Sequence, residues 1–92
     1  MSKLDPDSAT KIINRLKRIE GQARGIQRMV AEGQDCKLVI DQLNALRAAV
    51  QNATKTLIGE YLECCVKAEL ARGGDCREAI KKAMALLLNT RI

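Results

Sequence analysis

The sequence contains no histidine, phenylalanine or tryptophan, and its only aromatic residue is Tyr61. The absence of histidine excludes Cys–His catalytic pairs and metal sites that mix histidine with cysteine ligands. There is also no glycine-rich phosphate-binding loop, and no pair of carboxylates occurs in a pattern typical of an active-site cleft. We therefore do not expect an enzyme. Without Phe or Trp, the chain lacks the aromatic platforms on which single-stranded nucleic-acid bases stack.

The scarcity of aromatic residues also limits the core that this chain can form. A single domain of 92 residues buries proportionately little apolar surface and is marginal unless it is cross-linked, binds a metal or oligomerises. We expect this chain to oligomerise.

Long apolar runs are missing too, although 47% of the residues are hydrophobic. Charged residues interrupt every stretch before it reaches the roughly 20 apolar residues of a membrane-spanning helix. No positively charged start is followed by the apolar core of a signal sequence. We therefore expect a cytoplasmic protein without membrane contact, whose four cysteines are thiols rather than a disulfide framework.

The apolar pattern predicts three helices and no strand. The first is expected over about residues 8–31, with Asp7 or Ser8 as its cap and Gly33 just after its end. Its apolar residues recur at alternating steps of four and three, which is typical of a coiled-coil seam. This seam consists of Ile12, Leu16, Ile19, Ala23, Ile26 and Val30.

The second predicted helix is much longer, over about residues 36–72, because no proline interrupts it and Asp35 can cap its start. Its seam follows the same steps through Val39, Leu43, Leu46, Val50, Ala53, Leu57 and on to Cys64. Gly73 and Gly74 then break the pattern. Asp75 is expected to cap a short third helix over about residues 76–89.

Two of the cysteines, Cys36 and Cys65, fall on the predicted long helix. They are 29 positions apart, which corresponds to roughly 43 Å at a helical rise of about 1.5 Å per residue. Within one chain the two thiols are therefore too far apart to meet. Only a second, antiparallel chain can bring Cys36 close to a Cys65, which makes an inter-subunit switch possible.

The net charge of +5 is concentrated in one segment. Between Lys11 and Arg28 there are six basic residues and one acidic residue, whereas the rest of the chain carries ten of each. Lys11, Arg15 and Arg18 share a helix face, and Arg24 and Arg28 form a second pair. Scattered charges are usually just a solvated helix face. This concentration of arginine instead favours binding to the phosphates of duplex DNA.

Three stretches carry a resemblance to a known family. The sequence IINRLKRIEGQARGIQRMVAEGQDC, followed by VIDQLNALRAAV and then by YLECCV, closely resembles the copper-sensitive operon repressor (CsoR) family, which has relatives for nickel, formaldehyde and persulfides. The resemblance covers nearly all of residues 12–66. It implies an all-α, three-helix protomer that forms an antiparallel four-helix-bundle dimer, and two dimers that form a disc-shaped tetramer.

The resemblance also implies which residues bind operator duplex DNA. In the family, basic residues of the first two helices form the DNA-binding face. The matching positions here are Arg15, Lys17, Arg18, Arg24 and Arg28, together with Lys11, Arg47 and Lys55.

Copper sensors of the family hold Cu(I) with a Cys, a His and a second Cys across the dimer interface. Cys36 and Cys65 match the two thiols, whereas Tyr61 occupies the histidine position. A phenol is a poor ligand for Cu(I) compared with imidazole. The family's coupling network also includes a Glu of the third helix, near which this chain offers Lys81 and Lys82.

Other branches match less well, because nickel sensors need several histidines and formaldehyde sensors have Pro where this chain has Ser2. The remaining branch keeps only the two thiols and resembles the persulfide sensor CstR. This resemblance implies a repressor without a cofactor, in which Cys36 attacks a low-molecular-weight persulfide or polysulfide. Cys65 of the facing subunit then resolves the product into a sulfur bridge, which releases the operator.

Two other interpretations stay open. The first is a Cu(I) sensor with Cys36 and Cys65 as thiolate ligands and Cys64 as a further candidate, although adjacent helical residues point about 100° apart. The second is a helical thiol carrier or interaction protein that binds no DNA. Apart from the copper interpretation, Cys64 is expected to be a core residue and Cys76 a bystander.

Overall fold

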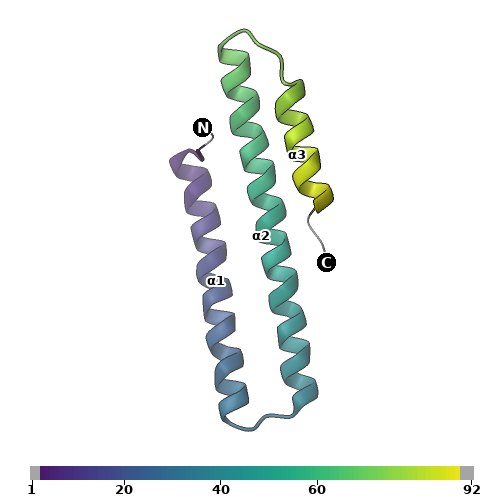
Figure 1. Ribbon diagram of the computed structural model, residues 1–92. Coiled ribbons are helices and arrows are strands. Elements are labelled where there is room, and N and C mark those ends of the chain that lie inside the picture. Colours follow the sequence, from purple (N-terminus) through teal and green to yellow (C-terminus); the bar gives the residue numbers. More distant parts are fainter. Residues whose placement is uncertain (1–2, 90–92) are drawn as a thin grey trace.

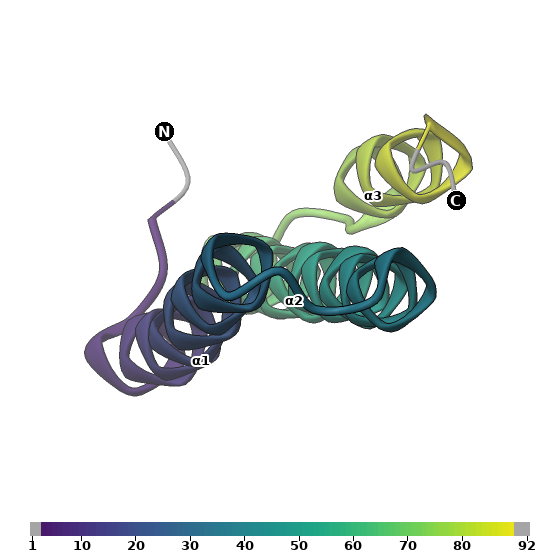
Figure 2. The same ribbon diagram turned by 90° about the horizontal axis from the view of Figure 1, so that it is seen from below.

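The computed structural model describes residues 3–89, which form three helices in the order α1 (Pro6–Ala31), α2 (Cys36–Ala71) and α3 (Arg77–Asn89). Each helix runs antiparallel to the one before it, and α2 lies between the other two (Figure 1). Viewed along the helices, α1 and α3 contact different sides of α2 (Figure 2). Within residues 3–89 there is no strand, so the predicted three-helix, all-α protomer is confirmed.

The start of α1 differs from the prediction. Asp5, rather than Asp7 or Ser8, is the N-cap, because its carboxylate accepts a hydrogen bond from the Ser8 backbone N–H at 2.8 Å. Pro6 follows at the first helical position, where the missing N–H of proline costs nothing. The Ser8 side chain is therefore available for another role.

The other helix ends lie close to the predicted positions. Asp35 precedes α2 as expected, but its side chain makes no capping hydrogen bond. Gly33 and Gly73 adopt φ values of +71° and +73°, which glycine tolerates best, and so allow the chain to leave α1 and α2. Asp75 accepts a hydrogen bond from the Arg77 N–H at 2.7 Å, so α3 begins one residue later than predicted.

The protomer is a thin slab of 59 × 26 × 14 Å with a small core. Its radius of gyration is 17.3 Å, compared with about 12 Å for a compact domain of this length. Its accessible surface is 6999 Å², compared with about 5,300 Å² for a monomer of this mass. The buried apolar side chains are Ile12, Ile26, Ala53, Ile58, Ala79 and Ala83.

Much of the predicted seam is exposed in the single protomer. Leu16 of α1 is 52% exposed, and Leu43, Val50 and Leu57 of α2 are 47%, 45% and 39% exposed. A continuous apolar stripe of this kind is typical of a surface that packs against another subunit. The surplus surface and the stripe together support the expected dimer.

A charge placed in this stripe is expected to prevent dimerisation. Val50→Glu should raise the dimer dissociation constant at least about 100-fold, because the carboxylate would have to be buried without a partner. Sedimentation velocity over a range of concentrations measures this shift. Leu88→Glu is the matched control, since Leu88 is 80% exposed near the end of α3. Wild-type sedimentation of Val50→Glu would show that the stripe is not the interface.

Candidate functional site

The two candidate sensing thiols lie at opposite ends of one helix, as predicted. Cys36 is the first residue of α2 and is exposed, whereas Cys65 is half-buried two turns before the helix ends. Because α2 is continuous between them (Figure 1), their separation is roughly 43 Å at the standard helical rise. A contact between these thiols requires two chains.

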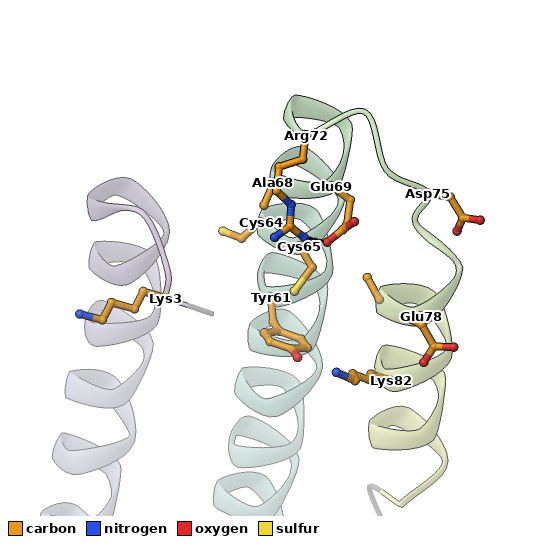
Figure 3. A pocket seen from close by; sticks show the side chains of 11 residues that line it. Lys3, Tyr61, Cys64, Cys65, Ala68, Glu69, Arg72, Asp75, Glu78 and Lys82 are labelled. Carbon is orange, nitrogen blue, oxygen red and sulfur yellow. Dashed lines mark ion pairs between the residues drawn. The ribbon is translucent and has the colours of Figure 1, made fainter. Parts of the chain in front are cut away.

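Cys65 lines a groove of about 680 Å³ between the C-terminal part of α2 and α3. Tyr61, one turn earlier on the same face, also lines this groove. Figure 3 shows the Cys65 sulfur directed along α2 toward the Tyr61 ring, whereas the Cys64 sulfur points away from α3. Cys64 also lines the groove, and the two adjacent sulfurs diverge as the helical geometry requires. Within residues 3–89, no three His, Cys, Asp or Glu side chains of the single chain converge as a metal site.

The third helix contributes an acidic side chain to this groove that the sequence pattern did not indicate. Glu78 and Lys82 both line the groove (Figure 3). Lys81, on the same helix, pairs with Glu78 at 3.9 Å. The sequence pattern indicated Lys81 and Lys82 in this part of the third helix, but not Glu78. The half-buried Cys76 does not line this groove.

A hydrogen-bonded cluster connects α1 to α2 next to the thiol groove. The Glu60 carboxylate accepts a hydrogen bond from Ser8 Oγ at 2.7 Å and pairs with Lys11 Nζ at 3.1 Å. The Glu60 side chain is only 13% exposed, and Ser8 is buried. These two bonds lower the pKa of Glu60, and the Ser8 N–H lowers the pKa of Asp5. The carboxylate thus stays charged between two helices.

Acid is expected to weaken this connection. A carboxylate whose pKa is lower in the folded protein contributes stability at neutral pH, and this stability is lost as the pH falls through the lowered pKa. Thermal unfolding followed by circular dichroism should give a Tm that decreases below about pH 4.3, the ordinary glutamate pKa. The decrease should be smaller in Glu60→Gln, which cannot titrate. Parallel pH profiles of the two proteins would contradict this role of Glu60.

The basic residues of α1 form two separate stripes. Arg15 and Arg18 line a shallow groove of about 400 Å³ beside α2, together with Gln22, Ala49 and Asn52. The second stripe lies on the outer face of α1, because nine residues after Arg15 the helix has turned by about 180°. It consists of the exposed residues Lys17, Arg24 and Arg28. Within one protomer, the two stripes therefore face in opposite directions.

The candidate DNA-binding residues of α2 are both exposed but lie differently relative to the groove that Arg15 and Arg18 line. Arg47 lies two residues, or about 200°, from Ala49, which lines the Arg15–Arg18 groove. Lys55 lies one turn after Asn52, which lines the same groove. Ser2 lies outside the described residues. No helix within residues 3–89 is both long enough and apolar enough to cross a membrane.

Comparison with known proteins gives consistent results at the levels of family, sequence and structure. The family model "Metal-sensitive transcriptional repressor" matches residues 8–89. The copper-sensing transcriptional repressor CsoR of Bacillus subtilis is 40% identical over 74 residues, which cover 80% of this chain and 72% of that protein. RicR of Mycobacterium tuberculosis, also a copper-sensing transcriptional repressor, is 42% identical over 60 residues, which cover 65% of this chain and 62% of RicR.

Solved structures show the same fold. CsoR from Geobacillus thermodenitrificans, crystallised with Cu(I), has a TM-score of 0.72 at 29% identity and covers 95% of this chain and 90% of its own. The nickel-responsive regulator InrS has a TM-score of 0.71 at 28% identity, with 89% and 91% covered. These relatives are transcriptional regulators rather than enzymes, as expected for this chain. The family resemblance is thereby confirmed, and the chain belongs to the family of metal-sensitive transcriptional repressors.

Proposed function

We propose that this chain is a cytoplasmic repressor that binds operator duplex DNA through α1. Two protomers pair in antiparallel orientation to form a symmetric dimer, and two dimers form a tetramer. The signal is received by Cys36 of one protomer together with Cys65 of the facing protomer. The observation that carries this proposal is the continuous helix α2, which separates the two thiols within a chain. An antiparallel pair of α2 helices brings the Cys36 end of each chain to the Cys65 end of its partner.

The first candidate signal is Cu(I). CsoR of Bacillus subtilis and RicR are copper-sensing repressors, and one structural neighbour was solved with Cu(I). Two thiolates are soft ligands that suit this ion, so the residues present fit it even without a histidine. Cys36 and Cys65 would hold the metal, with Cys64 as a further candidate ligand. The metal would supply a bond that ties the two subunits together.

The second candidate is a low-molecular-weight persulfide or polysulfide, and Tyr61 is the observation that favours it. A tyrosine beside Cys65 leaves a pair of thiols rather than a mixed ligand set. The Cys36 thiolate would attack the outer sulfur of a persulfide and release the thiol, which leaves Cys36 as a persulfide. The Cys65 thiolate of the facing subunit would then attack the Cys36 sulfur and release hydrogen sulfide, forming a disulfide. A polysulfide with more sulfur atoms would leave a longer bridge.

Two measurements on the same protein distinguish the signals. Anaerobic titration with Cu(I) under a competing chelator, followed by fluorescence anisotropy of a labelled operator duplex, should show tight stoichiometric binding that releases the DNA. Release by polysulfide but not by Cu(I), with cross-linked dimers in intact mass spectra, would instead establish the second candidate. A protein that binds no duplex at low salt would be a thiol carrier or interaction protein.

A further inference from the structure

The Glu60 cluster contains a residue that the operator-binding surface would otherwise use. Lys11 lies one turn before Arg15 and two turns before Arg18, so the three side chains share a face of α1. Among them, Lys11 is the one whose ammonium is paired with a carboxylate, that of Glu60, at 3.1 Å. Its side chain is 66% exposed, so a DNA phosphate could reach the same ammonium.

The carboxylate that holds Lys11 is itself fixed in place. Ser8, which is buried, donates to one oxygen of Glu60 while Lys11 occupies the other. If Lys11 turned toward a phosphate, the Ser8 bond would keep the negative charge of Glu60 at the edge of the basic face. Phosphates would then lose attraction and meet a nearby like charge.

We propose that Glu60 is an internal competitor of operator phosphates for Lys11. By pairing with this ammonium, Glu60 withholds one positive charge per protomer from DNA and weakens the repressor–operator complex. The inference rests on the proposed DNA-binding function of α1. It also assigns Lys11 a different role from Arg15, although the sequence places both on one face.

The position of Glu60 adds a route by which the thiol site can act on this competition. Glu60 directly precedes Tyr61 and lies one turn before Cys64 on the same rigid helix. A shift or rotation of this part of α2, when Cys65 binds to or reacts with its signal, must move the carboxylate against Lys11. The pair thereby links the sensing end of α2 to the start of the basic face.

The test uses full-length Glu60→Gln, Lys11→Gln and the double variant, with the anisotropy of a labelled operator duplex measured at several salt concentrations. The amide oxygen introduced by Glu60→Gln can still accept the Ser8 bond, so the connection between α1 and α2 is preserved. Glu60→Gln should bind about five- to ten-fold more tightly at about 0.1 M salt, and the salt slope should steepen by about 0.9 for each additional phosphate that the protein neutralises. In the Lys11→Gln background the same substitution should have no effect on the slope.

A comparison of Lys11→Gln with Arg15→Gln tests the same inference even if Glu60→Gln is poorly folded. Lys11→Gln alone should leave the salt slope nearly unchanged, although the unpaired Glu60 carboxylate should weaken binding by repulsion, whereas Arg15→Gln should lower the slope by about 0.9 for each phosphate that it neutralises. An equal loss of slope in both variants would overturn the inference. So would an unchanged salt slope in a folded Glu60→Gln, or an equal increase in affinity in the Lys11→Gln background, which would indicate simple charge repulsion. A wild-type protein that does not bind the duplex would instead refute the proposed function.

Discussion

Mixed dimers of Cys36→Ser and Cys65→Ser protomers are expected to regain a signal response that neither variant has alone. In an antiparallel dimer, each site combines Cys36 of one chain with Cys65 of the other. A homodimer of either variant has one thiol missing from both sites. A heterodimer has one site with both thiols missing and one that is complete, so it should respond to the signal.

The size of the recovery follows from the symmetry. If equal amounts of the two variants are unfolded together and refolded, about half of the dimers are mixed, and each has one intact site of two. Cu(I) binding or polysulfide cross-linking should therefore reach about one quarter of the wild-type stoichiometry. Each variant alone should show none, because a single thiol completes no site.

Controls separate this geometry from other arrangements. Cys76→Ser should respond like the wild type, and Cys64→Ser should too unless Cys64 is a third ligand for Cu(I). A mixture that remains inactive, while both variants dimerise and bind the duplex, would show that the two thiols do not meet across subunits. The proposed sensing site would then be wrong for both candidate signals.

The parts of the fold that depend on local pattern could be predicted from the sequence. The steps of four and three indicated the three helices, and the lack of proline indicated the continuous α2 that separates Cys36 from Cys65. The first cap was predicted wrongly because Asp5, Asp7 and Ser8 are all good capping residues. Pro6 is the signal that distinguishes them, since proline is favoured at the first helical position and thus points to Asp5.

The relations between helices could not be predicted in the same way. The sequence spacing places Lys11 and Arg15 on one face of α1, but it does not show that Glu60 of α2 faces Lys11. Glu78 lines the Cys65 groove because of the position that α3 takes along the axis of α2. No local sequence pattern determines this position. The direction of Arg47 could have been predicted from helix geometry, because it lies about 200° from Ala49. That prediction first required knowledge of which surface of α2 faces α1.

Removal of the two arginines beside α2 is expected to abolish operator binding at moderate salt. Arg15→Gln with Arg18→Gln removes two positive charges from the groove that α1 forms with α2. If both arginines of each protomer in a dimer meet phosphates, four phosphates are no longer neutralised. The salt slope should then fall by about 3.6, and affinity at about 0.1 M salt should fall more than about 100-fold.

The matched control removes the same charge from another helix. Arg77→Gln with Lys81→Gln changes two exposed basic residues of α3, which pair with Asp75 and Glu78 and lie outside the proposed DNA surface. This control should retain nearly all of the wild-type affinity and slope, because counterions are released only where phosphates are contacted. Anisotropy titrations of both double variants, after sedimentation has shown equal assembly, provide the comparison. Equal losses in the two variants would mean that net charge, and not the Arg15–Arg18 surface, holds the operator.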